Sequence, residues 1–288
     1  EFAGGRGEEG ELRDVEVYLR CGEGGVDDPP RDRALLKALV AKVGVNAHTV
    51  TDQDVPLAAA LYPREFGAAF NHSCAPNCAQ LFDLLPAASP PRLRVVTLDD
   101  IPKDAELTIG YIDLLAPRRD RAAQLRLAYH FTCACPRCAA DLARELHHPT
   151  TYSAPDAALV LDRARSVAFA VERHPTPSLA RKALALLEHD LATHQHPALR
   201  TDLRCYLAQA LRGACLFAIA AGEFGTAGVL AGRLCSAMEE FVPARAVELA
   251  VARLRAGKLA VWAGGRARVR EAAGWLGKAR EVLVRLFP

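Results

Sequence analysis

The chain has 288 residues, enough for one large or two ordinary domains, and its hydrophobic content of 51% is typical of a globular protein. Its 36 basic residues are nearly balanced by 34 acidic ones, and the formal charge of +2 argues against a nucleic-acid binder. No run of about eighteen apolar residues occurs, so we expect neither a membrane span nor a signal peptide. Because the chain does not begin with methionine and Met238 is its only one, we expect an incomplete or trimmed chain.

The first elements are weakly specified. Residues 1–30 are rich in glycine and acidic side chains and form a poorly specified N-terminal segment with one β-like interval at 15–19. Apolar residues recur at helical spacing from Arg31 to Val43 and predict an amphipathic helix. Asp52 or Asp54 then caps a predicted second, short helix that ends near Leu61.

Short strands follow. Alternating and β-branched residues predict strands over 79–84, 92–98 and 106–109. A proline-rich loop over 86–91 separates the first two, and an aspartate-rich turn lies between the second and the third. Pro117 suits the first turn of a helix that runs to Tyr129.

Beyond about residue 145 the pattern is almost entirely helical. Apolar stripes at spacings of three and four residues predict packed helices around Leu187 and Leu207 and in a last helix from Val269 to Leu286. The turn at 221–224 resembles the turn between the helices of tetratricopeptide-type hairpins, although the full repeat signature is absent. We therefore predict a stacked-helix domain over 150–288.

The cysteines carry the clearest chemical signal. Cys133, Cys135 and Cys138 form a C-x-C-x-x-C run, and Cys74, in a turn-like S-C-A-P-N string, is the natural fourth ligand of a tetrahedral zinc site. The alternative is a set of free thiols or a disulfide. Nine cysteines in this pattern indicate a reducing compartment, so we expect an intracellular protein of the cytoplasm or the nucleus. Three further cysteines are predicted to be small core residues, and two are left unassigned: Cys205, Cys215 and Cys235, then Cys21 and Cys78.

Two strings carry a family resemblance. The first is N-H-S-C-A-P-N-C from Asn71 to Cys78, and the second runs from Tyr111 through an arginine-rich helix into Y-H-F-T-C-A-C-P-R-C, ending at Cys138. Between them, Glu106 is followed by leucine. In this order the strings resemble the SET-and-MYND family of protein lysine methyltransferases.

The resemblance implies an S-adenosylmethionine-dependent enzyme with structural zinc. It implies that the cofactor is contacted by Asn46, Asn71, His72, Tyr111 and Phe131, and that Tyr111 is also the active-site tyrosine. Tyr129 is assigned only packing. The resemblance covers about residues 31–288, because the first half of the SET domain and the MYND module are missing. The G-R-G at residues 5–7 resembles the family's cofactor loop, but two glutamates replace the apolar strand that should follow.

The chemistry of methyl transfer to a lysine explains why an active-site tyrosine such as Tyr111 is needed. Methyl transfer from a sulfonium requires a neutral amine, whereas a free lysine has a pKa near ~10.4. An aromatic channel lowers that pKa by desolvation, and a positioned hydroxyl aligns the lone pair.

Each of these residues also has a structural interpretation. Without the resemblance, Asn71 and His72 are a hydrogen-bonded turn and Tyr111 is a half-buried strand residue. The arginines of residues 118–126 are predicted to form a solvated helix face rather than a nucleic-acid site. His147 and His148 are predicted to belong to a hinge between domains.

We therefore expect an α+β fold: a SET-domain β-fold with inserted helices and a zinc-binding post-SET segment, followed by an all-α tetratricopeptide-like domain. The expected boundaries are 31–116 for the SET portion, 117–145 for the post-SET helix and zinc segment, and 150–288 for the stacked helices. The expected function is protein-lysine N-methylation, with histone or non-histone substrates. The alternative is a catalytically inactive scaffold whose helical domain binds proteins. No membrane or nucleic-acid partner is expected.

Overall fold

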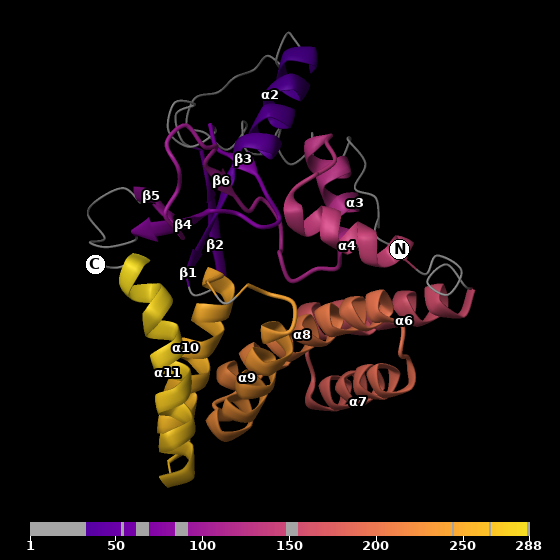
Figure 1. The fold of residues 1–288 in the computed structure, drawn as a ribbon, viewed down its shortest axis with the longest axis vertical. Helices are drawn as coiled ribbons and strands as arrows, with labels where there is room; N and C mark the ends of the chain where they lie inside the picture. The colour runs from indigo at the N-terminus through magenta and orange to yellow at the C-terminus, as the bar shows by residue number, and fades with distance from the viewer. Residues whose placement is uncertain are drawn as a thin grey trace, which may run out of the picture.

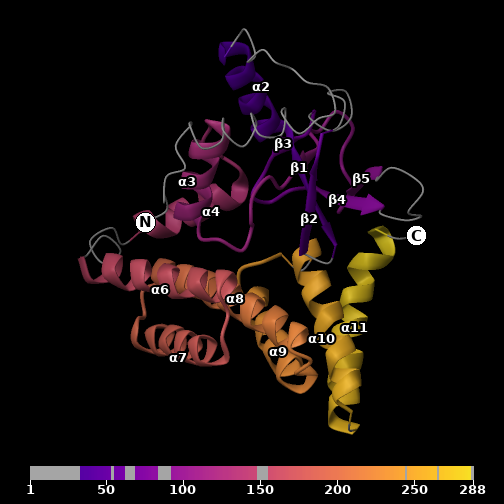
Figure 2. The same cartoon turned by 180° about the vertical axis from the view of Figure 1, so that it is seen from behind.

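The computed structural model describes residues 33–52, 55–61, 69–83, 92–147, 155–243, 245–264 and 266–286. The poorly specified segment 1–30, the loop over 86–91, His148 and Cys21 lie outside these residues. The described part has the expected α+β architecture, with short strands and α2 at one end of the molecule and the helices α6–α11 at the other (Figure 1). The view from behind shows α3 and α4 between these two parts (Figure 2).

The helix expected from Arg31 to Val43 is present as α2, Arg33–Asn46. The prediction of a short helix that ends near Leu61 is wrong. Instead, β1, His48–Asp52, and β2, Val55–Ala60, pair as antiparallel strands with a register shift after Val50. Short apolar runs do not distinguish helix from strand by periodicity, and here the pairing between the two runs decides.

Four further strands lie within the described residues. β4, Cys78–Asp83, pairs antiparallel with β5, Arg92–Thr97, close to the predicted bounds. β3, Asn71–His72, pairs parallel with β6, Thr108–Ile109, which is shorter than the strand predicted over 106–109. The β3–β6 pair places the segment that holds Cys74 beside the segment that holds Tyr111.

The post-SET segment contains two helices. α3, Arg118–Tyr129, follows Pro117, which occupies the N-cap position rather than the first turn. α4, Pro136–Leu146, was not expected; its proline fits the first turn, where a backbone N–H has no partner in the helix. The predicted hinge residue His147 caps the C-terminus of α4.

The C-terminal part is a stack of helices: α6, Pro155–Arg173; α7, Pro177–Thr193; α8, Pro197–Ala220; α9, Phe224–Glu239; α10, Val247–Ala263; α11, Arg266–Leu286. Their apolar stripes form the largest core of the described residues, in which Leu187 is fully buried and Leu207 is 9% exposed. Gly222, at φ +76°, makes the predicted turn between α8 and α9. Val269 departs from the prediction because it is 54% exposed.

Within the described residues, α8 is the one helix long and apolar enough to cross a membrane. It packs against α6, α7 and α9 and buries most of its apolar residues, as a core helix does. Close packing on α6 requires Gly213, since a Cβ there would lie 3.0 Å from the backbone of Glu172. Cys205, Cys215 and Cys235 are buried core residues, as predicted.

Candidate metal centre and adjoining cavity

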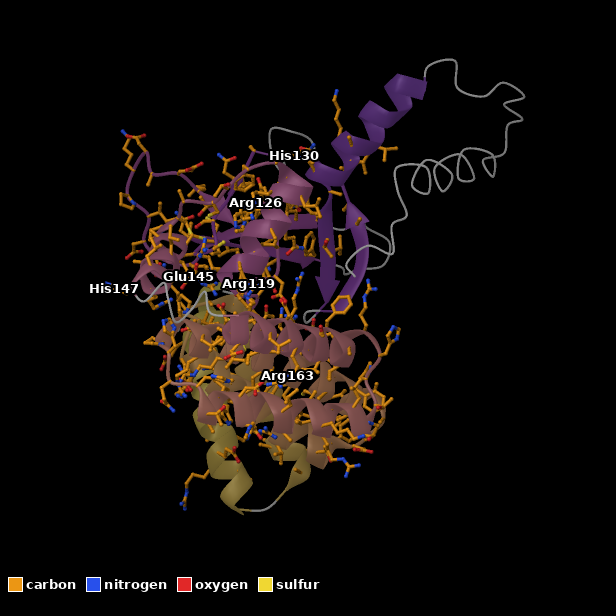
Figure 3. All side chains as sticks on the ribbon, turned by 90° about the vertical axis from the view of Figure 1, so that its right-hand side faces the viewer. Arg119, Arg126, His130, Glu145, His147 and Arg163 are labelled. Atoms are coloured by element: carbon orange, nitrogen blue, oxygen red, sulfur yellow. The ribbon has the colours of Figure 1, made fainter. Side chains whose placement is uncertain are left out.

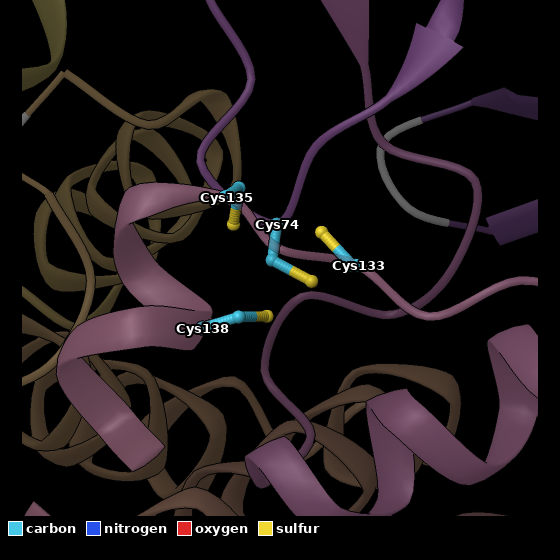
Figure 4. A group of neighbouring side chains, drawn as sticks. All are labelled: Cys74, Cys133, Cys135 and Cys138. Atoms are coloured by element: carbon cyan, nitrogen blue, oxygen red, sulfur yellow. The ribbon is translucent and has the colours of Figure 1, made fainter. Parts of the chain in front are cut away.

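Four cysteine side chains converge at the junction of the strands and the post-SET helices (Figure 4). The sulfur atoms of Cys74, Cys133, Cys135 and Cys138 all lie within 4.8 Å of one another. All four are free thiols in the structure, so the disulfide alternative does not describe it. The four cysteines that the sequence predicts as zinc ligands therefore lie together in the structure.

Local structure explains the convergence. Cys135 is the N-cap of α4, in extended conformation, and Cys138 lies in the first turn of the same helix. Residues three apart on a helix lie on one side of it, so these two sulfurs face the same point. Cys133 reaches that point from the extended segment before α4, and Cys74 from the loop that follows β3.

The residues fit a zinc ion. A tetrahedral ZnS₄ centre has Zn–S bonds near ~2.3 Å, which places its sulfurs about 3.8 Å apart, so a small contraction of the observed cluster is sufficient. The thiols also perturb one another. Hydrogen bonds from Cys138 and Cys74 lower the pKa of Cys135, while the hydrogen bond with Cys135 raises the pKa of Cys138 to about 11. Such a cluster holds four thiolates together only with a cation between them.

Two arginines adjoin the cluster, one buried and one half-buried. Arg121, 1% exposed, donates to the Ala116 carbonyl at 2.6 Å and to Asp141 at 2.7 Å. Burial lowers the pKa of Arg121, but the Cys74 charge and Asp141 outweigh it and hold that pKa above its ordinary value. Arg137 donates to the Cys74 carbonyl at 3.2 Å. Four thiolates with Zn²⁺ carry a net charge of −2, and these two guanidinium groups oppose it.

Arg121 therefore corrects the expectation of a solvated arginine face on α3. Its neighbours Arg118 and Arg119 are paired with Glu145 and Asp162, whereas Arg126 remains at the surface (Figure 3).

His72 connects the cysteine cluster to Tyr111. Its Nδ1 accepts a hydrogen bond from the Tyr111 backbone N–H at 3.0 Å, so a neutral ring carries its proton on Nε2. That Nε2 lies 3.2 Å from the Cys74 sulfur. Burial lowers the pKa of His72 to about 4, so the ring is neutral at pH 7. The side chain thus fixes the backbone of Tyr111 relative to Cys74.

Tyr111 is half-buried, and its hydroxyl donates to the Phe70 carbonyl. Burial raises the pKa of this phenol, with smaller contributions from Tyr129 and Glu106, and keeps it protonated at neutral pH. The Tyr129 ring lies 4.9 Å from that of Tyr111, and its hydroxyl is 3.4 Å from the Tyr111 carbonyl oxygen. Tyr129, to which the sequence assigned only packing, therefore belongs to the same site.

A cavity of about 1680 Å³ lies beside these tyrosines, between the strands and the helices α8–α11. It exceeds the usual 300–1,000 Å³ of a small-molecule pocket, so it has room for more than one ligand. Of the predicted site residues, Asn46 and Tyr111 line it. Asn46 ends α2, and its amide donates to the Lys42 carbonyl at 2.7 Å.

The other predicted cofactor residues lie next to this cavity rather than in its wall. Asn71 is exposed and donates to Glu106 at 2.6 Å. Phe131 is half-buried, 6.0 Å from the His72 ring, and packs on the cysteine cluster. Asn77, from the same N-H-S-C-A-P-N string, receives the Thr108 N–H at 2.8 Å and donates to the Glu106 carbonyl. Its role is to hold the Cys74 loop on β6.

An ion-pair cluster joins the tyrosine segment to the helical part. Asp113 and Glu172 both bind Arg212, at 2.6 Å and 2.5 Å. Burial alone would raise the pKa of Asp113, but Arg212 outweighs it and holds that pKa below its ordinary value. Burial raises the pKa of Glu172, and Arg212 offsets part of that rise. The sequence did not indicate these contacts because Arg212 lies 99 residues from Asp113 and 40 residues from Glu172.

Comparisons with known proteins agree with this geometry. Residues 29–112 match the SET domain family. N-lysine methyltransferase SMYD2-A of Danio rerio is 35% identical over 108 residues, 37% of this chain and 23% of that protein.

Two further relatives match shorter segments. The SET domain and MYND-type zinc finger protein 6 of Schizosaccharomyces pombe is 44% identical over 71 residues, 25% of this chain and 14% of that protein. Histone-lysine N-methyltransferase ASHR1 of Arabidopsis thaliana is 34% identical over 99 residues, 34% of this chain and 19% of that protein. The chain thus spans less than a quarter of the length of these relatives. It carries a SET-domain segment of the SET-and-MYND type.

Proposed function

We propose that this chain is part of an S-adenosylmethionine-dependent protein-lysine N-methyltransferase. The observation that supports this best is Tyr111, a protonated phenol in the wall of the large cavity, held from one side by His72 and the cysteine cluster. The similarity to lysine methyltransferases supports the same reaction class.

In this proposal Tyr111 orients the amine of a lysine from a histone or non-histone protein. Bound S-adenosylmethionine supplies an electrophilic methyl group on its sulfonium. Tyr111 and Tyr129 desolvate the lysine stem, which favours the neutral amine, and the Tyr111 oxygen directs its lone pair. The new N–C bond forms as the C–S bond breaks, and the amine proton leaves to water. Asn46, Asn71, His72 and Phe131 hold the cofactor.

Zinc has a structural role in the proposal. Cys74, Cys133, Cys135 and Cys138 bind one Zn²⁺, which closes the loop after β3 onto α4 and leaves no open coordination position for chemistry. Free thiols at all described cysteines support a reducing compartment, so we assign the protein to the cytoplasm or the nucleus.

The first experiment is titration calorimetry of the purified chain with S-adenosylmethionine, with zinc content measured on the same sample. The proposal expects cofactor binding and one zinc per chain. Zinc without cofactor binding would favour the alternative of a zinc-containing scaffold whose helical part binds proteins.

The second experiment replaces Tyr111 by phenylalanine and measures methyl transfer to a lysine peptide. Loss of one catalytic hydroxyl should reduce the rate by about 10²-fold or more with unchanged zinc content. Tyr206→Phe is the matched control, because that hydroxyl binds Asp120 away from the cavity. Equal rates for Tyr111→Phe and wild type would remove Tyr111 from the mechanism.

A further inference from the structure

One face of α10 forms a long wall of the cavity. Val247, Val251, Leu254, Lys258 and Trp262 recur every three or four residues, and all of them line it. At 1.5 Å per residue, the fifteen steps from Val247 to Trp262 span about 22 Å. That length matches six or seven residues of an extended peptide at about 3.3 Å each.

An exposed aromatic pair ends this wall. Trp262, in the last turn of α10, is 71% exposed, and Phe224, at the start of α9, is 36% exposed. Their rings meet edge to face with centroids 4.9 Å apart. Val261, 50% exposed, adds to the same patch. Exposed apolar groups gathered in one wall of a cavity are typical of a binding surface.

A second wall leads from the tyrosine site to this pair. Arg212, Leu216 and Ile219 lie on one face of α8 and line the cavity. Arg212 binds Asp113, two residues after Tyr111, and Phe224 follows soon after Ile219. The rise along α8 from Arg212 to Ile219 is about 10 Å, and with the turn to Phe224 the path fits about four to six extended residues.

The middle of the α10 wall is basic. Arg255 and Lys258 line the cavity between Val251 and Trp262, and Lys258 is exposed. The acidic Glu248 lies two helical turns away, near the end of α10 that packs on the β4–β5 sheet through Val247. A ligand that reaches Trp262 therefore passes two cationic side chains, which favour a carboxylate in it.

We propose that this wall is the substrate-selecting surface of the chain. Its occupant is an extended segment of the protein substrate that carries a large apolar residue four to six positions from the target lysine and an acidic residue between the two. The apolar side chain docks on Phe224 and Trp262, and the acidic one faces Arg255 and Lys258. The assignment rests on the proposed methyl transfer, because that reaction puts the lysine at Tyr111.

Trp262 itself supplies the assay. The chain has two tryptophans, and Trp275→Phe leaves Trp262 as the single tryptophan, which is excited selectively at wavelengths where tyrosine does not absorb. The probes are thirteen-residue peptides with a central lysine in a serine–glycine background. Phenylalanine is placed four, five or six positions away on either side, with one aspartate between it and the lysine. Matched peptides carry serine or asparagine at these places. Binding and methyl transfer are both measured.

Docking predicts a blue shift of Trp262 emission when a phenylalanine peptide binds. It also predicts that, for phenylalanine on one particular side of the lysine, the peptide binds at least tenfold more tightly than the matched serine peptide. Trp262→Ala, studied by labelled-peptide anisotropy, should abolish that ratio, whereas Leu159→Ala, at an exposed leucine of α6, should keep it. Lys258→Glu should reverse the preference for aspartate, whereas Lys182→Glu on α7 should not.

The outcomes separate the two proposals. Methyl transfer without a phenylalanine preference overturns the docking surface and leaves the transferase intact. A preference that depends on Trp262, without any methyl transfer, supports the docking surface and removes the catalytic assignment. A concentration-dependent blue shift without peptide would assign the aromatic pair to self-association and overturn the proposal.

Discussion

Arg212 is the cation between two carboxylates, and its removal is the sharpest test of how the helical part supports Tyr111. Arg212→Met keeps an aliphatic side chain but leaves Asp113 and Glu172 without their shared partner. Side-chain exposures of 23%, 31% and 27% place the cluster between a buried and a surface ion pair. Loss of one partner costs about 3–5 kcal/mol when buried, and surface pairs contribute at most about 1 kcal/mol, so we expect about 2–3 kcal/mol.

The cost should depend on pH. The low folded pKa of Asp113 contributes stability that is present above its unfolded pKa and is lost as pH falls through the folded value. The raised pKa of Glu172 acts in the opposite sense, because stability falls as pH rises through it. Without Arg212 the pKa of Glu172 rises further, and each unit of that rise adds about 1.4 kcal/mol to the deficit at neutral pH. The deficit should therefore be larger at pH 7.5 than at pH 5.

Urea unfolding of wild type and Arg212→Met, followed by circular dichroism at both pH values, measures this difference. In the variant background Glu172→Gln should restore part of the lost stability, because it removes the buried carboxylate that Arg212 no longer neutralises. A deficit below 1 kcal/mol at pH 7.5, or one that is the same at both pH values, would show that the cluster does not join the two parts.

Three further predictions concern the post-SET segment. Cys138→Ser should lower bound zinc from one equivalent towards zero and destabilise the fold. The control Cys215→Ala, in the helical core, should keep the metal. A full equivalent of zinc in Cys138→Ser would exclude Cys138 as a ligand. Arg137→Gln should weaken zinc binding about 10- to 100-fold in competition with a chromophoric chelator, and an unchanged affinity would contradict the charge argument. His130, at φ 60°, caps α3 in the left-handed region, so His130→Val should cost about 1–2 kcal/mol in thermal unfolding. His130→Asn should be tolerated there, and equal stability of the two variants would refute the backbone argument.

The sequence was sufficient to predict those features that depend on residues close together in the chain. The C-x-C-x-x-C spacing predicted a cluster because it places three sulfurs within six residues, and Cys74 followed from ligand number. The N-terminus of α4, which was not expected, places Cys135 and Cys138 on one side. Helical stripes predicted the stacked helices for the same reason, since periodicity is a local property.

Long-range packing explains what the sequence did not predict. Arg121 looked like its surface neighbours on α3 and is buried only because α4 and the sulfur cluster cover it. Tyr129 joins the site because the αL turn at His130 separates it from Phe131, so that the Tyr129 ring lies tilted against Tyr111 and Phe131 lies near His72. The β1–β2 pair depends on cross-strand contacts that neither run shows by itself.

Tyr111 is held from two directions, and this bears on what the helical part does. Its backbone N–H is fixed by His72, which touches the candidate zinc ligand Cys74, and two residues later Asp113 is fixed by Arg212 of α8. A hydroxyl that must align a lone pair tolerates little displacement, so both attachments matter to the proposed reaction. The helices are then part of the catalytic frame as well as of the substrate cavity. Metal removal and Arg212→Met therefore disturb the same tyrosine from opposite sides.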